Sequence, residues 1–245
     1  MLVSRIGFGA FKIGRNQGAK YPNAYDLPSD EQIEGLFESL LEMGINYIDT
    51  APAYGRSEQL VGRATAGRRD HFVISTKVGE VFEAGHSTHD FSANAVRQSI
   101  ERSLGRLKTE VLDLVFIHSN GEDLQILHES DAVATLQQLQ QKGCVRAIGF
   151  SGKTIEGTVA ALSWADAIMV EYSIGQRDLK AVITEAAKAE IAVMVKKGLG
   201  SGQLPPTEAI RFVLANHAVT SLLIGSLNID HMRENVAAAP RNTSV

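Results

Sequence analysis

The fold of this chain is constrained most by a regular alternation of short apolar runs with segments of helical period. Runs rich in Val, Ile, Leu and Phe are typical of buried parallel strands. They lie at 3–11, 46–50, 72–78, 112–118, 146–151, 167–173, 191–197 and 220–226. The helical segments between and after them are 29–44, 92–107, 131–142, 154–163, 179–189, 206–214 and 229–238. This alternation predicts an α/β fold, a (β/α)₈ TIM barrel with a parallel sheet inside and helices outside.

An open doubly wound sheet is the rival architecture. It requires a G-x-G-x-x-G turn after the first strand and an acidic residue about twenty positions later. Gly7, Gly9 and Gly14 do not have this spacing, and the glycines at 198–202 come late in the chain. The closed barrel is therefore favoured. The polar stretch Gly14–Pro28 follows the first strand and predicts a loop over the barrel mouth.

Length and composition exclude several classes of protein. A chain of 245 residues with 44% hydrophobic content can form one large core, so we expect residues 1–245 to be a single domain. A formal net charge of -4 argues against nucleic-acid binding. The single cysteine, Cys144, excludes an intramolecular disulfide, and neither a signal peptide nor a membrane span is evident. We expect a soluble cytoplasmic protein, monomeric and without a membrane partner.

Four chemically useful side chains follow three consecutive apolar runs. Asp49 and Tyr54 come at and just after the run 46–50, Lys77 ends the next run, and His118 ends the run 112–118. Each residue alone has an ordinary structural explanation. Because barrels build active sites at the carboxyl ends of their strands, the joint placement predicts one common site.

The chemistry of this set suits the protonation of a carbonyl oxygen. A tyrosine hydroxyl has an unperturbed pKa of about 10, and a neighbouring ammonium stabilises the phenolate and lowers that pKa. Lys77 would therefore make Tyr54 a usable general acid, and Asp49 would hold Lys77 in place. His118 could donate a hydrogen bond to the carbonyl oxygen.

Several segments resemble the signature blocks of the aldo-keto reductases. They are Gly44–Gly55, Ile74–Gly79, Asp113–His118, the fifth-strand block Ile148–Gly152, and the phosphate and adenosine block from Leu222 to Asn235. The resemblance covers essentially the whole chain. It implies NAD(P)H-dependent reduction of aldehydes or ketones to alcohols, with Tyr54 as general acid, Lys77 and Asp49 as its tuning pair, and His118 orienting the carbonyl.

Coenzyme-binding candidates cluster near the end of the chain. Gly225 and Ser226 end the last strand and Asn228 precedes a helix, so backbone amides, a hydroxyl and a helix N-terminus predict an anion site. Glu234 and Asn235 are expected either to meet an adenine edge or to form an exposed helix face. With the resemblance, the candidates are Ser151, Lys196, Gly198, Leu199, Gly225, Ser226, Asn228, His231, Glu234 and Asn235.

The chain departs from the family pattern at the coenzyme. Gly152 and Met169 stand where many relatives carry Asn and Gln, and Lys196 lies in the segment where many carry an aromatic that stacks on the nicotinamide. Gly225 and His231 align with the Lys and Arg that usually hold a 2′-phosphate. NADPH is expected from the family, and NADH stays open. Short segments after the fourth and seventh strands predict an open pocket and high Michaelis constants for simple carbonyl substrates.

Other functions remain as alternatives. A lysine at a strand end (Lys77, Lys196 or Lys197) could form a Schiff base, as in aldolases. A regulatory subunit could bind the coenzyme without turnover. The group His86, His89 and Asp90 has metal-like spacing but no fourth ligand in view, so we expect polar loop surface there and no metal.

Overall fold

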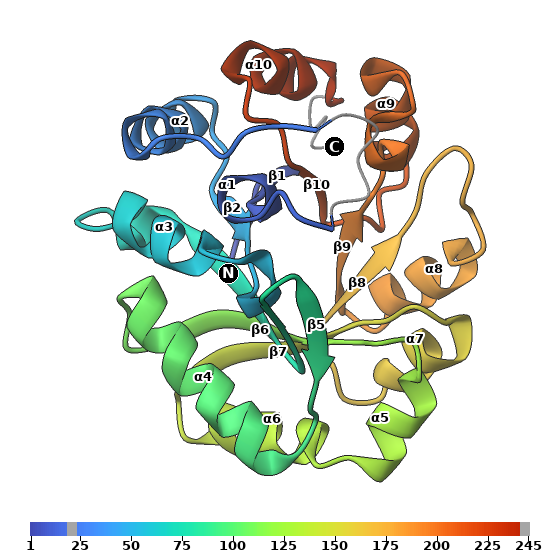
Figure 1. Cartoon of the computed structure of the whole chain (residues 1–245). Helices are drawn as coiled ribbons and strands as arrows, with labels where there is room; N and C mark the ends of the chain where they lie inside the picture. The colour runs from blue at the N-terminus through green and yellow to red at the C-terminus, as the bar shows by residue number, and fades with distance from the viewer. Residues whose placement is uncertain (19–23, 241–245) are drawn as a thin grey trace.

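A closed barrel of eight parallel strands forms the centre of the molecule (Figure 1). The computed structural model describes residues 1–18 and 24–240, so part of the predicted loop Gly14–Pro28 and the tail 241–245 lie outside the described residues. Every apolar run forms a barrel strand, and the predicted fold is confirmed. Around the barrel the order is β1 (Ile6–Gly9), β10 (Ser221–Ile224), β9 (Ala192–Lys196), β8 (Ala167–Glu171), β7 (Val145–Ser151), β6 (Leu112–His118), β3 (Val73–Val78) and β2 (Tyr47–Asp49).

Helices surround the barrel at the segments where the sequence predicts them. Ser29 begins the first of these with a capping box, because its side chain accepts from the backbone N–H of Gln32, whose own side chain accepts from Ser29 N–H. Ser92 caps another helix by accepting from the N–H of Ala95. The helices are α2 (Asp30–Glu42), α4 (Ala93–Leu107), α6 (Ala132–Gln141), α7 (Ile155–Ala161), α8 (Lys180–Lys188), α9 (Pro206–Leu214) and α10 (Ile229–Ala238).

Several short elements were not predicted. The helix between β2 and β3 is α3, and a hairpin, β4 with β5, follows β3. Ala84 and Gly85 form the hairpin loop, both with positive φ, which is the backbone that a two-residue hairpin turn requires. The unpredicted elements are α1 (Phe11–Gly14), α3 (Ser57–Ala64), α5 (Asp123–Glu129), β4 (Glu80–Glu83), β5 (His86–His89), η1 (Pro52–Tyr54), η2 (Arg69–His71) and η3 (Gly200–Gly202).

The hairpin corrects the expectation of a loop at His86 and His89. Both residues lie in β5, where His89 pairs with Glu80 and His86 with Glu83, and both are exposed. Alternation over only four residues per strand was too short to be recognised as a strand pattern. Among the described residues, no group of three or more His, Cys, Asp or Glu side chains is arranged to hold a metal ion.

Side-chain alternation along the strands separates two hydrophobic clusters. A small cluster inside the barrel contains Tyr47, Leu114 and Phe116, while Ile48, Val115 and their neighbours belong to the larger cluster between barrel and helices. Successive side chains of a strand point to opposite faces. Asp49 therefore shares the inward face of Tyr47, and His118 shares that of Phe116. Both side chains point into the barrel at the carboxyl ends of their strands.

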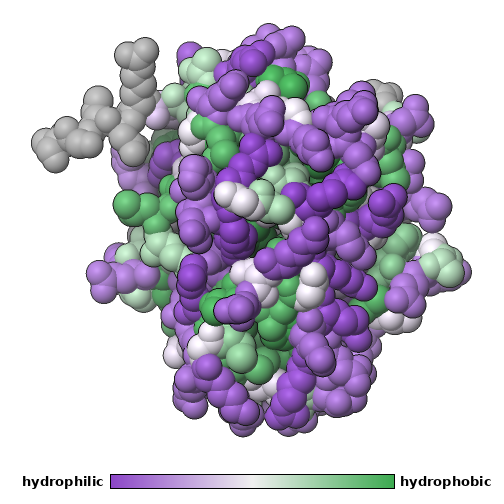
Figure 2. All heavy atoms as spheres, turned by 90° about the vertical axis from the view of Figure 1, so that its left-hand side faces the viewer, coloured by the Kyte–Doolittle hydropathy of each residue, from purple (hydrophilic) through white to green (hydrophobic). Residues whose placement is uncertain are grey.

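The outside of the helical layer is largely polar. Figure 2 shows the side of the molecule that carries α2, α3 and α4, where hydrophilic side chains predominate and hydrophobic areas are scattered between them. This is the surface expected of amphipathic helices whose apolar stripes face the barrel. In residues 1–18 and 24–240, no helix has the length and apolar character needed to cross a membrane.

Candidate active site

Asp49 and Lys77 form a buried ion pair at the barrel mouth. The Lys77 ammonium nitrogen, Nζ, donates to both carboxylate oxygens of Asp49 at 2.7 Å and to the carbonyl oxygen of Thr50 at 2.9 Å. Ser75 Oγ donates to Asp49 Oδ1 at 2.8 Å and lies 2.9 Å from the hydroxyl of Tyr47. Burial lowers the pKa of Lys77, and the contacts with Asp49 act in the opposite direction. The ion pair therefore keeps a cation at a position that solvent does not reach.

Tyr54 is brought over this pair by a tight backbone contact. It ends η1, and Gly55 follows with φ of 61°. A Cβ on Gly14 would lie 2.3 Å from the carbonyl oxygen of Tyr54, and a Cβ on Gly55 would lie 2.3 Å from that of Gly14. Only glycine fits where these two segments meet. The approach fixes the position of Tyr54 relative to the end of β1.

The ring of Tyr54 lies close to both the lysine and the histidine. Its centroid is 4.7 Å from Lys77 Nζ and 6.4 Å from the ring centroid of His118, to which it is almost perpendicular. Phe11 packs on the same ring with a centroid distance of 5.1 Å. The four residues predicted from the strand ends are therefore brought together at one mouth of the barrel.

His118 has a partner that sequence reasoning missed. Its Nδ1 lies 2.8 Å from Oε2 of Glu80, the first residue of β4. Glu80 Oε1 accepts from Ser87 Oγ at 2.7 Å across the hairpin. Burial lowers the pKa of His118, while Glu80 acts to raise it. A carboxylate at the start of an unpredicted strand carried no sequence signal beyond its closeness to Lys77.

A cleft of about 550 Å³ lies beside this mouth, between the segment after β9 and the start of α10. We call it the β9–β10 cleft. It contains most of the predicted coenzyme residues: Gly198, Leu199, Gly225, Ser226, His231, Glu234 and Asn235. Lys12 of α1 and Lys197 also line it and were not predicted. The lysine side chains and the backbone N–H groups at small residues suit the phosphates of a dinucleotide. The pair Glu234 and Asn235 suits the edge of an adenine.

Three predicted coenzyme residues do not line the β9–β10 cleft. Asn228 turns its side chain back to α10, where Oδ1 accepts from the backbone N–H groups of Asp230 and His231. The helix N-terminus that was expected to bind an anion is thus capped by its own chain. Ser151 and Lys196 instead contact each other, with Lys196 Nζ 2.9 Å from Ser151 Oγ.

Comparison with known proteins decides the family. The model of the aldo/keto reductase family matches residues 5–209. The chain belongs to the aldo/keto reductase family. A protein of Pseudomonas aeruginosa described as an aldo-keto reductase has a solved structure that superposes with a TM-score of 0.90, at 42% identity over 97% of this chain and 90% of that one.

More distant members of the family match over similar lengths. An aldo-keto reductase of Bacillus halodurans superposes with a TM-score of 0.81 at 26% identity, over 96% of this chain and 86% of that one. The L-galactose dehydrogenase of Arabidopsis thaliana is 27% identical over 96% of this chain and 84% of its own length. The family consists of oxidoreductases, and that general class extends to this chain.

Lys196 is an unusual feature of the mouth in this aldo-keto reductase. It ends β9, and its ammonium meets Ser151 Oγ and, at 3.3 Å, the carbonyl oxygen of Gly152. Burial lowers the pKa of Lys196 to about 8, with Glu171 opposing the shift. The adjacent Lys197 forms an ion pair with Glu171 at the rim. Lys196 is thus a cation without a directly paired carboxylate among the described residues.

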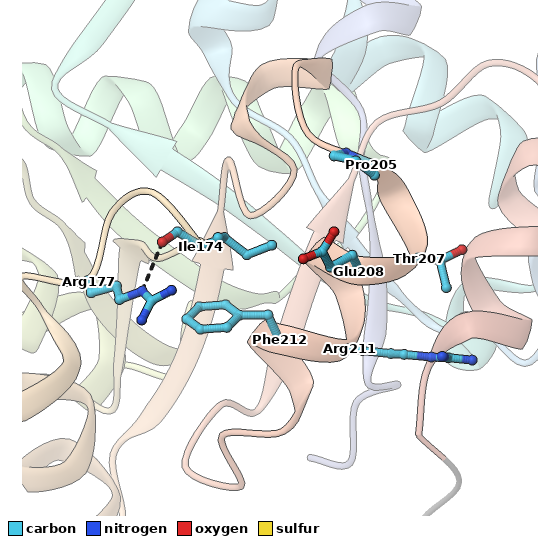
Figure 3. A pocket seen from close by; sticks show the side chains of 7 residues that line it. All are labelled: Ile174, Arg177, Pro205, Thr207, Glu208, Arg211 and Phe212. Atoms are coloured by element: carbon cyan, nitrogen blue, oxygen red, sulfur yellow. Dashed lines mark hydrogen bonds between the residues drawn. The ribbon is translucent and has the colours of Figure 1, made fainter.

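A second hollow of about 620 Å³, here called the outer cleft, lies on the other side of α9 from the β9–β10 cleft. Figure 3 shows Arg177 beside Phe212, donating to the carbonyl oxygen of Ile174, whereas Arg211 points away. The guanidinium carbon of Arg177 is 4.7 Å from the centroid of the Phe212 ring. The two arginines do not converge on one point of the outer cleft.

Proposed function

We propose that this aldo-keto reductase reduces aldehydes and ketones to alcohols with NADPH or NADH as the electron source. The observation that carries the proposal is the position of Tyr54, whose ring centroid is 4.7 Å from the buried Lys77 ammonium nitrogen and 6.4 Å from the ring centroid of His118. The β9–β10 cleft lies at the same end of the barrel. A proton donor, a buried cation and an imidazole at one point are the groups that carbonyl reduction needs.

The four residues have distinct roles in this mechanism. The Tyr54 hydroxyl gives its proton to the carbonyl oxygen, and the Lys77 ammonium stabilises the phenolate that remains. Asp49 holds Lys77 by two charge-assisted hydrogen bonds of 2.7 Å. His118 orients the carbonyl oxygen toward Tyr54. The bound coenzyme supplies the hydride that adds to the carbonyl carbon.

The coenzyme would extend from the barrel mouth along the β9–β10 cleft. Lys12 and Lys197 offer cations to its phosphates, with Ser226 as a further donor. Glu234 and Asn235 offer an acceptor and a donor to the adenine amino edge. Ser151 and Lys196 lie at the barrel end, where the nicotinamide amide would meet the Ser151 hydroxyl.

The coenzyme preference, the substrate size and the quaternary state are proposed on the same basis. We propose NADPH as the preferred coenzyme, with His231 in the β9–β10 cleft as the group that would meet a 2′-phosphate. We propose small aldehydes and ketones as substrates, bound weakly, because only α5 and η3 follow the fourth and seventh barrel strands near the mouth. Residues 1–245 would act as one domain and as a monomer in the cytoplasm.

The first test is a fluorescence titration of the purified protein with NADPH and with NADH, followed by a panel of small aldehydes monitored at the coenzyme absorbance. Binding of either coenzyme, with oxidation when an aldehyde is added, supports the proposal. Binding without oxidation for every carbonyl tried would instead support a coenzyme-sensing subunit. Absence of binding to both coenzymes would rule out the proposed reaction.

One observation favours a second candidate, a Schiff-base lyase. At neutral pH, a pKa of about 8 leaves roughly a tenth of Lys196 as the nucleophilic free amine. Borohydride in the presence of a carbonyl substrate would then attach that substrate covalently to Lys196, as seen by peptide mass. Under the reductase proposal, borohydride leaves the mass of the protein unchanged, and Tyr54→Phe loses aldehyde-dependent coenzyme oxidation without losing coenzyme binding.

A further inference from the structure

His118 has two ring nitrogens, and the structure assigns them to different surroundings. Nδ1 faces Glu80, whose Oε2 is 2.8 Å away, while the ring meets Tyr54 edge to face at the barrel mouth. The side chains of His118 and Glu80 are only 18% and 15% exposed. The two side chains are therefore largely shielded from solvent, and their relative position is held more firmly than that of an ion pair on the surface.

Glu80 is itself held in place by the hairpin. Ser87 on β5 donates to Glu80 Oε1 at 2.7 Å, so each carboxylate oxygen has its own partner. On the same hairpin, the Phe82 ring lies 3.3 Å from the guanidinium carbon of Arg15, and Arg15 in turn donates to the carbonyl oxygen of Ala53 at 2.9 Å. The hairpin is thus tied to the two segments that carry the rest of the mouth.

The charge of Glu80 determines which nitrogen of His118 carries the proton. Burial acts to raise the pKa of Glu80, but the contacts with His118 and Ser87 outweigh it and lower that pKa to about 2. At neutral pH Glu80 is therefore a carboxylate, which only accepts hydrogen bonds. The 2.8 Å contact is an ion-pair distance without the alignment of a hydrogen bond, but a lone pair on Nδ1 this close to an anionic oxygen would be repelled. Nδ1 is therefore the nitrogen that carries the hydrogen, and in the neutral ring Nε2 then carries a lone pair.

We infer that Glu80 is a positioning residue that fixes the Nδ1–H tautomer of His118, so that His118 donates to a substrate carbonyl only as the imidazolium. This inference rests on the proposed carbonyl reduction for its functional part. A neutral His118 with a lone pair at Nε2 repels a carbonyl oxygen, whereas the imidazolium donates from Nε2 while Nδ1 stays on Glu80. The hairpin after β3 therefore makes the enzyme an acid-favoured reductase.

The other charged groups that face His118 set the pH at which it changes from imidazolium to neutral imidazole. Glu80 raises the pKa of His118, while burial and the ammonium groups of Lys77 and Lys196 lower it, and the net direction is downward from 6.5. The imidazolium fraction then falls about tenfold for each pH unit above that pKa. We expect kcat/KM for aldehyde reduction to fall about a hundredfold over two pH units through and above neutrality.

The substitution Glu80→Gln tests whether Glu80 fixes the tautomer of His118 or only supports the local structure. The amide has the shape of the carboxylate but no charge, so neutral His118 is free to adopt the Nε2–H form and donate without being protonated. The expected result is a flattened pH profile, with less than about a threefold change where the parent enzyme changes about a hundredfold. Ser87→Ala is the matched control, because it loosens the same carboxylate without removing its charge and should keep the steep profile.

The decisive readout is the tautomer itself, measured by long-range ¹⁵N–¹H correlation of the histidine side chains. The chain has 7 histidines, and His118→Asn identifies the signal of His118 by its loss. A protonated Nδ1 and an unprotonated Nε2 in the parent protein at neutral pH, with the Nε2–H form appearing in Glu80→Gln, support the inference. An Nε2–H tautomer in the parent protein, or equal pH profiles for parent and Glu80→Gln, would overturn it.

These two measurements also separate this inference from the proposed function. If the protein binds no coenzyme and reduces no aldehyde, the proposed reaction fails, and the spectrum still decides the tautomer assigned to Glu80. If reduction proceeds but the tautomer is wrong, only the role of Glu80 fails.

Discussion

Removal of one member of the buried pair Asp49–Lys77 has a calculable effect on stability. In Asp49→Asn the side chain keeps an oxygen for the Ser75 hydroxyl but loses the charge that two contacts of 2.7 Å bring to Lys77. The Lys77 ammonium is only 1% exposed, so water cannot replace the carboxylate. Leaving a buried charge without its partner costs about 3–5 kcal/mol, and we expect the free energy of unfolding to fall by that amount.

The same substitution should impair the reaction. Without Asp49, burial lowers the pKa of Lys77 further, because the largest opposing interaction is gone, and the ammonium loses the two contacts that hold it beside Tyr54. A general acid without its tuning cation loses about 10²–10⁴ in rate. We expect kcat/KM for an aldehyde to fall within that range while coenzyme affinity stays unchanged.

A double variant separates the two effects. Asp49→Asn with Lys77→Met removes both charges of this pair, and replacing a buried ion pair by neutral groups is often close to neutral for stability. Urea unfolding followed by the fluorescence of the single tryptophan, Trp164, measures this. The double variant should regain most of the lost stability and none of the activity. Additive losses in the double variant, or a fully active Asp49→Asn, would refute the reasoning.

Three further predictions follow from other parts of the structure. Lys12→Met should weaken the affinity for both NADPH and NADH by about tenfold or more in a fluorescence titration, because a charge-assisted contact in the β9–β10 cleft is lost. Unchanged affinity would show that Lys12 does not contribute to coenzyme binding. Asp113, at the other end of the barrel, accepts a hydrogen bond from Arg146 at 2.6 Å. Because Arg146 stays 58% exposed, Asp113→Asn should lower the free energy of unfolding by about 1–3 kcal/mol with kcat unchanged. A loss of kcat would contradict the assignment of that end of the barrel to stability. The pKa of Glu80, lowered to about 2, gives stability that is complete above about pH 4.5 and is lost as the pH falls toward 2. Because the side chains of His118 and Glu80 keep 18% and 15% of their surface exposed, acid titration should reduce the stability of the parent protein by only about 1–2 kcal/mol more than that of Glu80→Gln. Equal acid sensitivity of the two proteins would be inconsistent with the pair.

The barrel could be predicted because each strand has a local signature. An apolar run of strand length followed by a helical period defines a βα unit without reference to the rest of the chain. The side-chain period of two then places Asp49 and His118 on the inward face, at the end of the barrel where active sites form. The common location of these two residues with Lys77 and Tyr54 could therefore be predicted from position alone.

The parts that could not be predicted depend on contacts between distant segments. Glu80 meets His118 only because the hairpin folds back over the mouth, and its Ala84-Gly85 turn is a weak sequence signal. Lys12 reaches the β9–β10 cleft because the short helix α1 follows β1 directly. The side chain of Asn228 caps α10 by accepting from the backbone N–H groups of Asp230 and His231. Sequence spacing does not show whether a residue of this type caps its helix or contacts an anion, so its predicted role at the coenzyme stays a prediction.

The central claim, that Tyr54 is the proton donor of a carbonyl reduction at this mouth, is tested most directly by Tyr54→Phe. This variant keeps the ring that packs on Phe11 and faces Lys77, and removes only the hydroxyl. We measure NADPH affinity by fluorescence and the single-turnover rate of coenzyme oxidation by an aldehyde. The account predicts unchanged affinity and a rate lower by about 10²–10⁴. A Tyr54→Phe protein that oxidises the coenzyme at the parent rate would contradict it.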